Sequence, residues 1–537
     1  MTSIFDSIAE LRKCQWYWGS ISSREAENLL TNEPPGTFLV RDSRNENYIY
    51  SLTFKTEGNI IHSRLAKYNG YYCLGGPHSL IKCAINLRHN IFAVSSGSLP
   101  SAIAIVRLSG KDALLHIKKL TRKKEIIPRK VFYSPLYDKE GDIIDRSMVV
   151  YLNGPNTFTG EDTAEFFVHG SRAVVRSLCY ELGTMKDTDY AKAGEFTRRA
   201  LLNKKMDLAQ VEALSDLIAA DSDAQRRQAL KSDSIGSIME PLREKLLNLI
   251  ARYEASIDFA DDVTSNDDDI LNEAKKIIIE LEKLEKSSKR GTLIKDGISV
   301  VLMGRTNVGK SSLMNRIAEK DIALVSNIHG TTRDFLETRI QLNGLLLTIT
   351  DTAGIRSNSM DVLELKGIER SISKANDADI VIIVIDGSNC LDINNEINFL
   401  KSQIKYNEKK KIIICINKND LFETNNIKLE NVDEFITTST INSDGISDLI
   451  KKLSNESLAL LEDSNNNSEF ALSQQRHIKL IKKSKEFLER FIINTTIDSG
   501  IAAEDLRECA NCIGEITGTI VNEDILDSIF NTFCIGK

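Results

Sequence analysis

The sequence predicts a multidomain α/β protein in which a P-loop nucleotide domain is inserted into an α-helical domain. Gly304–Ser311 fits the pattern G-x-x-x-x-G-K-[ST] and lies between the apolar run Ile298–Met303 and the start of a helix. Strand signals alternate with helical or loop segments over residues 296–455, which is typical of a parallel sheet. Apolar residues recur at helical spacing on both sides of that region, over residues 207–295 and 456–537. A mixed α/β domain at 89–206 and a smaller α+β module at 1–88 complete the predicted organisation.

Composition excludes several classes of protein. The chain has 537 residues, 42% hydrophobic and 27% charged, which is ordinary for a globular protein of several domains. Its net charge of −7 means that any contact with nucleic acid must come from a local basic face. Nine scattered cysteines suit a reducing compartment, and we interpret Cys509 and Cys512 as helix packing. No apolar run approaches the ~18 residues of a membrane span, and we expect no signal peptide at the start.

Residues 1–88 differ in character from the rest. Ser22–Leu30 predicts a helix, with Ser22 or Ser23 as its N-cap and acids in its first turn. Strands are predicted at Tyr48–Lys55, Asn59–Ala66 and Tyr71–Leu74. Arg41 follows the apolar residues Phe38–Val40, and a guanidinium in such a strand is costly unless it meets an anion such as phosphate. The alternative is an arginine on the solvent side of an edge strand.

Residues 89–206 give a less specific signal. Strands are predicted at Ile91–Ser95, Ala102–Leu108, Met148–Leu152 and Glu165–Val168. The turn Gly154–Asp162 has the chemistry of a helix start, in which Thr159 would act as the cap. These patterns indicate only a mixed α/β domain.

The helical segments are defined by their periodicity. Leu246, Leu247, Ile250 and Tyr253 share one helical face, and comparable stripes occur near residues 208–218, 274–284, 480–491 and 503–513. We expect Gly291 to end the last helix before the P-loop. The acidic runs Asp258–Asp262 and Asp267–Asp269 are interpreted as solvated loops, and the Asn/Ser-rich stretch Ser464–Ser468 as a linker.

Each part of the P-loop has a chemical role. Gly304 and Gly309 let the backbone curl, so that N–H groups and the helix N-terminus face the phosphates of a nucleotide. Lys310 places a positive charge at the β- and γ-phosphates, and Ser311 offers a hydroxyl to Mg²⁺. The alternative, a chance glycine turn, is disfavoured because further nucleotide motifs follow in order.

Those motifs predict GTP rather than ATP. Asp351–Gly354 (DTAG) follows a strand, where an Asp acts near Mg²⁺ and a Gly N–H near the γ-phosphate. Thr331 and Thr332 lie where a switch-loop threonine ligates Mg²⁺. Asn417–Asp420 (NKND) resembles the guanine-reading N-K-x-D motif, because its carboxylate accepts two N–H bonds that adenine cannot supply. Ser439 and Thr440 are the remaining predicted base contacts.

Ile355 stands where many regulatory GTPases have a water-orienting glutamine. Its side chain cannot hydrogen-bond water, so hydrolysis must use another group. A downstream carboxylate is the natural candidate, namely Asp361, Glu364 or Glu369.

The N-terminal motifs WYWG, EAENLL, GTFLVRDS and HSRL resemble the Src-homology-2 domain, most closely the type in suppressor-of-cytokine-signalling proteins. The resemblance covers about 70 residues and implies a phosphotyrosine-peptide site at Arg41, Ser43 and His62, with Arg64 as the alternative to His62. The family continues with a second helix and a pocket-forming loop, whereas here the likeness stops near Leu80–Arg88. The module is therefore predicted to be partial.

From Asn90 to Lys537 the chain resembles the MnmE (TrmE) family of tRNA-modification GTPases. The carrying stretches are AIAIVRLSG, GPNTFTGEDTAEFFVHG, GEFTRRALLNKKMDLAQVEAL, GRTNVGKSSLMN, GTTRD, DTAGIR, NKND and FCIGK. The resemblance implies a folate-binding, dimer-forming N-terminal domain, a helical domain and an inserted G domain. It also implies an FAD-dependent partner of the MnmG (GidA) type, with which the enzyme adds an aminomethyl-type (carboxymethylaminomethyl) group at carbon 5 of the wobble uridine. The resemblance implies a cytoplasmic homodimer, with a mitochondrial location as the alternative.

The same resemblance assigns roles to single residues. Arg107, Glu165, Lys205 and Lys537 would contact a tetrahydrofolate derivative, either methylene- or formyl-substituted. Ser311 and Thr332 would ligate Mg²⁺, while Asn307, Ser326, Ile328 and Thr331 would hold K⁺. Glu364 would orient the attacking water, and Cys534 matches the cysteine of the C-terminal motif, for which a packed thiol is the alternative. The implied GTP contacts are Asn307, Val308, Gly309, Lys310, Ser311, Ser312, Ser326, Thr331, Thr332, Asp351, Thr352, Ala353, Gly354, Asn417, Lys418, Asp420, Ser439 and Thr440.

Two departures from the family affect the folate expectation alone. Ser95–Ser101 replaces a glycine-rich loop, and Ser171 replaces a second glycine after Gly170.

Two other interpretations of the whole chain remain. One is a phosphotyrosine-directed adaptor with a GTPase switch, and the other is a chimeric gene model in which the N-terminal module has no function.

Overall fold

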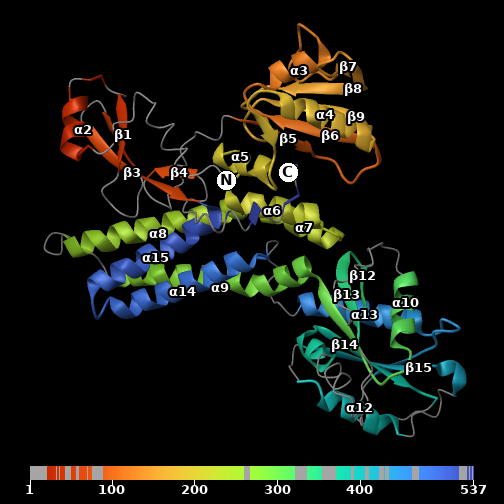
Figure 1. The fold of residues 1–537 in the computed structure, drawn as a ribbon. Coiled ribbons are helices and arrows are strands. Elements are labelled where there is room, and N and C mark those ends of the chain that lie inside the picture. Colours follow the sequence, from red (N-terminus) through yellow and green to blue (C-terminus); the bar gives the residue numbers. More distant parts are fainter. Residues whose placement is uncertain are drawn as a thin grey trace. The chain divides into compact units, whose positions relative to one another are not determined.

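The computed structural model describes most of the chain after residue 88 and parts of the segment before it (Figure 1). The described residues are 21–31, 33–34, 37–42, 50–55, 60–68, 71–74, 89–258, 267–320, 336–352, 371–388, 392–405, 410–422, 429, 434–462, 471–518, 526, 529–530, 533–534 and 536. They divide into two compact units, one comprising residues 1–206 and 520–537 and the other residues 207–519.

The N-terminal module has one described helix and a four-stranded antiparallel sheet in the order β1-β2-β3-β4. Ser22 caps the helix and exchanges hydrogen bonds with Glu25 in a capping box, which confirms the predicted helix start. Ala26, Leu30 and Leu39 form its small buried core. The elements are α2 (Ser23–Leu30), β1 (Phe38–Asp42), β2 (Tyr50–Lys55), β3 (Ile60–Tyr68) and β4 (Tyr71–Leu74).

The next domain is a six-stranded, mostly antiparallel sheet in the order β10-β5-β6-β9-β8-β7. Helices α3 and α4 pack into one hydrophobic core with this sheet, while Phe196 of α5 joins a second cluster with β5. The elements are β5 (Asn90–Val94), β6 (Ser101–Ser109), α3 (Ala113–Thr121), β7 (Phe132–Tyr137), β8 (Ile143–Leu152), β9 (Thr163–Gly170), α4 (Arg172–Thr184), β10 (Thr188–Tyr190) and α5 (Glu195–Leu202).

One local expectation in this domain is wrong. Thr159 does not cap a helix, because the turn leads directly into strand β9. Its hydroxyl is instead paired with the Ser109 hydroxyl at 2.7 Å and accepts the Glu161 backbone N–H.

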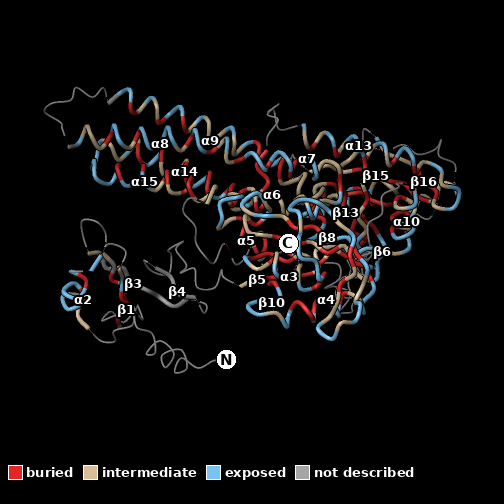
Figure 2. Tube along the Cα trace, turned by 90° about the horizontal axis from the view of Figure 1, so that it is seen from above, coloured by how far each residue is buried: buried red, intermediate tan, exposed pale blue. Residues whose placement is uncertain are grey.

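The helical domain combines segments from both sides of the P-loop region. A single hydrophobic core contains Leu246 of α8, Leu281 of α9, Leu488 of α14 and Ile513 of α15. Buried residues recur along each of these helices and alternate with exposed ones (Figure 2). The helices are α6 (Leu208–Ala219), α7 (Asp223–Ser232), α8 (Ile235–Asp258), α9 (Asp267–Asp296), α14 (Gln475–Asn494) and α15 (Ser499–Thr517).

Two expectations about α9 are wrong. Gly291 does not end the helix, which continues to Asp296; a Cβ at this position would lie 2.1 Å from the Leu472 carbonyl oxygen, so the glycine permits close packing. Asp267–Asp269 is not a loop but the first turn of the same helix, where the helix dipole stabilises carboxylates near the N-terminus.

The Cys509 and Cys512 side chains are buried in the bundle, which confirms their interpretation as helix packing. Ser464–Ser468 lies outside the described residues.

The inserted domain has a six-stranded sheet in the order β12-β13-β11-β14-β15-β16, parallel except for the β12–β13 pair. Its strands β11 and β14 are buried along nearly their whole length, as expected for a parallel sheet covered on both faces. The elements are β11 (Ile298–Met303), α10 (Lys310–Lys320), β12 (Leu336–Leu342), β13 (Leu345–Asp351), β14 (Ile380–Asp386), α12 (Ile393–Ser402), β15 (Lys411–Asn417), the 3₁₀ turn η1 (Asn419–Leu421), β16 (Phe435–Thr438) and α13 (Ile446–Glu462).

Candidate functional site

The predicted P-loop joins β11 to α10 at the carboxyl edge of the parallel strands, where α/β sheets bind ligands. Gly304 packs so closely on β14 that a Cβ would lie 2.2 Å from the Val384 carbonyl oxygen. Gly309 has a φ of +97° and Asn307 a φ of 62°, both in the left-handed region. The glycines of the motif are therefore required by a close approach and by a turn, as the sequence predicted.

Lys310 is folded onto the loop itself. Its ammonium donates to the Gly304 carbonyl at 3.2 Å and to the Arg305 carbonyl at 2.9 Å. Burial lowers the pKa of Lys310, and the charge of Asp351 opposes that shift. The lysine is thus held beside the loop, where it can exchange carbonyl partners for phosphate oxygens.

The two predicted partners of a divalent cation meet directly. The Ser311 hydroxyl at the start of α10 donates to Oδ2 of Asp351 at the end of β13. The other carboxylate oxygen, Oδ1, is buried and has no hydrogen-bond partner among the described residues. An anionic oxygen without a donor is costly unless a cation faces it, so this pair fits Mg²⁺. Thr352 orients the strand end by donating from its hydroxyl to the Leu302 carbonyl at 2.7 Å.

The predicted base-reading motif is tied to the P-loop. Asn417 donates from Nδ2 to the Val308 carbonyl at 2.8 Å and accepts a bond from the Thr438 hydroxyl. Lys418 has a left-handed φ of 67°, and its ammonium contacts Asp386 at 2.5 Å. Burial alone would raise the pKa of Asp386, but hydrogen bonds from Lys418 and Ser388 hold its pKa below the ordinary value.

Asp420 is positioned by a residue of the next predicted motif. The Ser439 hydroxyl donates to Oδ1 of Asp420 at 2.6 Å. The Thr440 carbonyl accepts a bond from Arg316 of α10 at 2.9 Å. The structure therefore brings Asn417, Lys418, Asp420 and Ser439 together on the side of the P-loop expected for a base.

Sequence reasoning missed an ion pair that supports this loop. Arg305, inside the P-loop, donates from Nε to Glu396 of α12 at 2.7 Å, and its Nη2 contacts the second carboxylate oxygen at 2.5 Å. Glu396 is buried although it lies in the first turn of an exposed-looking helix. Its partner is 91 residues away and occupies a variable position of the motif, so no local pattern indicates the pair.

The N-terminal domain brings two of the four predicted folate contacts together. Arg107 on β6 and Glu165 on β9 are cross-strand neighbours, and Nε of Arg107 donates to Glu165 Oε1 at 2.9 Å. The Arg107 guanidinium also lies 5.7 Å from the Phe158 ring centroid and 5.8 Å from that of Phe196. A guanidinium, a carboxylate and two rings fit a flat heteroaromatic ligand with N–H donors. Lys205 is exposed beside the turn at Gly160.

The C-terminal segment lies against this same domain. The Ser95 hydroxyl donates to the Gly536 carbonyl at 2.9 Å, although the two residues are 441 positions apart. Gly536 has a φ of +102°, and a Cβ there would lie 2.1 Å from the Val94 carbonyl oxygen. Cys534 is exposed in the same segment. Gly536 packs on Val94 of β5, and Arg107 lies on the neighbouring strand β6. The C-terminal segment is therefore close to the strand that carries Arg107.

Comparison with known proteins identifies the family of the chain. Residues 208–534 match the family model "MnmE helical domain", and residues 90–205 match "GTP-binding protein TrmE N-terminus". The chain belongs to the MnmE (TrmE) family. As a member of this family it is a tRNA modification GTPase, a hydrolase that acts on GTP.

Full-length relatives support the MnmE assignment. "tRNA modification GTPase MnmE" of Aquifex aeolicus is 38% identical over 459 residues, covering 84% of this chain and 100% of the relative. The MnmE of Rickettsia typhi is also 38% identical, covering 83% of this chain and 99% of the relative. Among solved structures, the G domain of the T. maritima FeoB iron transporter matches 30% of this chain at 25% identity, with a TM-score of 0.23.

Residues 16–82, before the MnmE region, match the model for the SH2 domain. Arg41 is 5% exposed in β1, where it pairs with Ser51 of β2. Burial on the strand excludes the alternative of a solvent-facing edge arginine. Ser43 lies outside the described residues, as does the side chain of His62.

Several predicted residues of the MnmE site also lie outside the described residues. These are Ser326, Ile328, Thr331, Thr332, Ala353, Gly354, Glu364 and Lys537. Ser312 is described and is exposed in the first turn of α10. The switch and potassium loops and the water-orienting glutamate of an MnmE protein therefore stay predictions.

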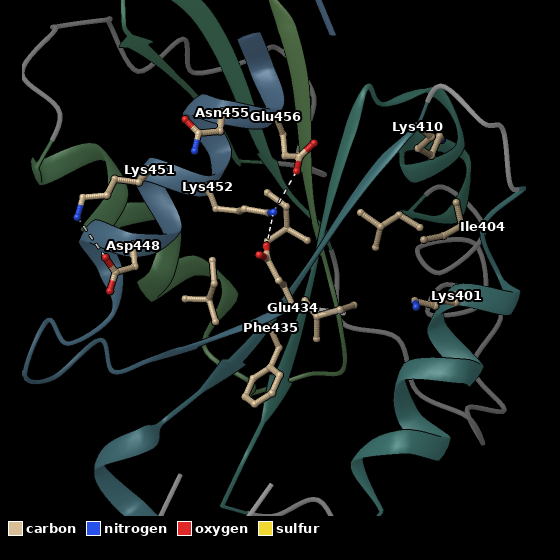
Figure 3. A pocket seen from close by; sticks show the side chains of 14 residues that line it. Lys401, Ile404, Lys410, Glu434, Phe435, Asp448, Lys451, Lys452, Asn455 and Glu456 are labelled. Carbon is tan, nitrogen blue, oxygen red and sulfur yellow. Dashed lines mark hydrogen bonds and ion pairs between the residues drawn. The ribbon is translucent and has the colours of Figure 1, made fainter. Parts of the chain in front are cut away.

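Two of the cavities lined by described residues of the G domain differ in character. One of about 760 Å³ lies against the P-loop and is lined by Arg305–Val308, Asp386 and Lys418. A larger one of about 1260 Å³ lies at the amino ends of β15 and β16, the opposite edge of the sheet (Figure 3). Several of its charged groups pair with one another, since Lys452 lies between Glu434 and Glu456 and Lys451 pairs with Asp448. We therefore take the cavity beside the P-loop as the candidate nucleotide site.

Among the described residues, none of the helices is both long and apolar enough to cross a membrane.

Proposed function

We propose that this chain couples GTP hydrolysis to the addition of a carboxymethylaminomethyl-type group at carbon 5 of the wobble uridine of certain tRNAs. It would act with an FAD-dependent partner of the MnmG type. The observation that carries this proposal is the combination, in one MnmE-family chain, of a P-loop with its Ser311–Asp351 and Asp420–Ser439 contacts and of an Arg107–Glu165 pair in the same domain as the C-terminal segment. The GTP site would supply the energy-dependent step, and the Arg107–Glu165 pair would offer a place for the one-carbon donor.

The direct test is chemical analysis of tRNA. Unmodified tRNA is incubated with this chain, an MnmG-type partner, GTP, K⁺ and a tetrahydrofolate derivative, with glycine or ammonium as the nitrogen source. Nucleoside mass spectrometry should detect the modified uridine only when all components are present. Formation of the same nucleoside without this chain would overturn the proposal.

In GTP hydrolysis, Lys310 would leave the Gly304 and Arg305 carbonyls and bind the β- and γ-phosphates. Ser311 and Asp351 would hold Mg²⁺, together with Thr332. The Ser311 hydroxyl, which now donates to Asp351, would turn its oxygen toward the cation. When bound, Mg²⁺ would neutralise negative charge on the phosphates. Asp420, held by Ser439, would accept the guanine N–H groups.

K⁺ and a carboxylate would complete the hydrolytic site. Asn307, which is exposed and has a left-handed backbone, would ligate K⁺ with Ser326, Ile328 and Thr331. Glu364 would orient the attacking water in place of the glutamine that Ile355 replaces. We expect GTP hydrolysis to be at least about tenfold faster in KCl than in NaCl, as a preorganised charge at the transition state should provide. Equal rates in both salts would remove the K⁺ assignment.

A tetrahydrofolate derivative, methylene- or formyl-substituted, would bind at Arg107 and Glu165, with Lys205 and Lys537 near its carboxylates. The bound group supplies the carbon that is transferred. Glu165 would accept N–H bonds from the ring, and Arg107 would contact the ring or the anionic tail while stacked near Phe158 and Phe196. Calorimetric titration should show folate binding by the wild type and a loss of at least about tenfold in Glu165→Gln, because one charged acceptor is removed. GTP hydrolysis should not change.

We also propose a homodimer, formed through the N-terminal domain, in which Cys534 lies near the folate. Residues 1–88 precede that domain and would weaken dimer formation. Sedimentation of the full chain and of a chain beginning at His89 tests this proposal. A dimer that is equally stable in both would contradict the effect of the extension.

A second candidate function concerns residues 16–82. The buried Arg41 on strand β1 of the SH2-like module favours a phosphate site that would take a phosphotyrosine peptide. Such a peptide should bind the wild type and not Arg41→Ala. If the peptide binds neither the wild type nor Arg41→Ala, the module does not bind phosphotyrosine peptides.

A further inference from the structure

The chain as a whole is acidic, but one short segment of the N-terminal domain is strongly basic. Residues 118–130 contain seven lysines and arginines and one acid, in a chain of net charge −7. The segment covers the last turns of α3 and the connection to β7, as Figure 1 shows. The basic residues are Lys118, Lys119, Arg122, Lys123, Lys124, Arg129 and Lys130.

The fold exposes these charges rather than pairing them. Six of the seven side chains are exposed, and Lys118 is half-buried. Within the part of the chain that the structure describes, none of the seven forms an ion pair with a carboxylate. Some lysines of the helical bundle are paired instead, since Lys245 pairs with Glu280 and Lys485 with Glu285. The segment therefore keeps a concentrated positive potential.

Local contacts hold the segment in a fixed shape. Arg122 ends α3 with a left-handed φ of 58°, and its guanidinium lies 4.2 Å from the Tyr137 ring centroid. The Lys123 ammonium lies 4.6 Å from the Phe132 ring centroid. Arg129 donates from Nη2 to the carbonyls of Asn153 and Asn156. These three contacts leave Lys119, Lys124 and Lys130 as exposed cations with no side-chain partner among the described residues.

Exposed apolar groups lie among the cations. Tyr133 on β7 is 63% exposed and Ile127 is 61% exposed. Ile127 lies within the basic segment, and Tyr133 follows the segment by three residues. An exposed ring next in sequence to exposed cations is typical of surfaces that bind ribonucleic acid, where phosphates meet lysines and an unstacked base meets an aromatic side chain.

We propose that the α3–β7 connection is a binding surface for the phosphate backbone of tRNA. This inference rests on the proposed function, which requires tRNA to reach the N-terminal domain. Lys119, Lys124 and Lys130 contact phosphates without reading sequence, and Tyr133 stacks on an exposed base. The charge complementarity selects a polyanion, and the tRNA-modifying activity of the family selects tRNA among polyanions.

The test compares two triple variants of the full chain. One is Lys119→Ala with Lys124→Ala and Lys130→Ala. The matched control removes three exposed lysines of the helical domain, by Lys275→Ala with Lys276→Ala and Lys479→Ala. Binding of a fluorescent unmodified tRNA transcript is measured by anisotropy from 50 to 200 mM KCl. GTP hydrolysis without tRNA is measured for both and should stay within about twofold of wild type.

We expect the first variant to bind tRNA at least about tenfold more weakly at 100 mM salt, with a log–log salt slope smaller by about 2 to 3, and the control to match wild type. Unchanged binding in the first variant, while wild type binds and modifies tRNA, would overturn this surface and leave the proposed function intact. A wild type that neither binds nor modifies tRNA would overturn the proposed function itself. Loss of binding to phosphatidylserine vesicles with unchanged tRNA binding would show that the surface serves lipid instead.

Discussion

At the scale of single residues, the P-loop depends on backbone conformations that only certain residues adopt. Gly309 has a φ of +97°, and a Cβ would lie 2.3 Å from Nδ2 of Asn417. We expect Gly309→Ala to weaken GTP binding by more than about tenfold, because left-handed strain of roughly 1–2 kcal/mol adds to the clash. Titration with a fluorescent GTP analogue measures the effect. Gly97→Ala, which meets nothing within 4 Å, is the matched control and should bind GTP as wild type does.

Another single-residue prediction concerns a buried charge cluster in the helical domain. Glu212 of α6 accepts bonds from Arg476 at 2.8 and 2.9 Å and lies 2.6 Å from the His477 ring. Burial alone would raise the pKa of Glu212, but Arg476 and His477 outweigh it and lower the pKa to about 2. A carboxyl whose folded pKa is depressed stabilises the fold above its unfolded pKa of ~4.3, and the contribution is lost as the pH falls toward 2.

Glu212→Gln should therefore lower the free energy of unfolding of the bundle by roughly 3 kcal/mol at pH 7, since Arg476 would stay buried without its anion. Urea unfolding followed by helical circular dichroism measures this, and the difference from wild type should shrink between pH 4 and pH 2. Glu504→Gln, 61% exposed on the same bundle, is the control. A loss of equal size at pH 7 in both variants would contradict the cluster's role.

The candidate site was predictable where its chemistry follows from adjacent residues. Lys310, Ser311 and Gly309 are adjacent in the chain, so a motif fixes their geometry. The contact of Ser311 with Asp351 followed from the order of the motifs. By contrast, the Glu212–Arg476 pair joins residues 264 positions apart, and only the packed bundle brings them together. Such pairs leave no periodic signal in the sequence.

At the scale of elements, a glycine in a sequence is ambiguous, because glycine is common both where a helix ends and where two segments pack closely. Gly291 reads as a helix stop, yet α9 continues through it and packs against the Leu472 carbonyl. The turn at Thr159 and the acids Asp267–Asp269 have the same composition as caps and loops, so their neighbours in space decide their structure. Contacts with distant residues therefore account for Gly291 and Thr159, whereas Asp267–Asp269 begins a helix whose dipole favours carboxylates.

The close packing at Gly291 predicts that an alanine there lowers the free energy of unfolding, although Gly→Ala in a helix usually raises it. In an exposed helix, Gly→Ala stabilises by about 1 kcal/mol. Here the added methyl would meet a carbonyl oxygen at 2.1 Å, so Gly291→Ala should lower the free energy of unfolding by about 1–3 kcal/mol. Gly183 of α4 is exposed, and a Cβ there would meet Phe92 at 3.6 Å and Tyr190 at 4.0 Å, which are ordinary contacts, so Gly183→Ala should be neutral or stabilising. Thermal unfolding of both variants measures the two signs.

At the scale of the whole molecule, the chain enters and leaves the G domain at one junction. Lys295, at the end of α9, contacts both Gln474 at 2.7 Å and Asp216 at 3.1 Å. Gln228 of α7 donates to the Ala471 carbonyl, where the chain returns. The inserted organisation was predictable because helical periodicity resumes after the sheet. The polar junction was not, because its members come from four separate segments.

The C-terminal segment gives the last prediction, which separates the two activities of the protein. Gly536 has a positive φ, and a side chain there would meet the Val94 carbonyl at 2.1 Å, so Gly536→Ala should displace this segment from β5. The nucleotide site belongs to the other compact unit and uses no residue of the segment. GTP hydrolysis should therefore stay within about twofold of wild type, while tRNA modification falls at least about tenfold, as expected when a group is moved by about 1 Å. Parallel assays of phosphate release and of the modified nucleoside measure both, with Gly183→Ala of α4, where an added Cβ meets side chains at 3.6 Å or more, as the control. Equal loss of both activities would show instead that the segment supports the fold as a whole.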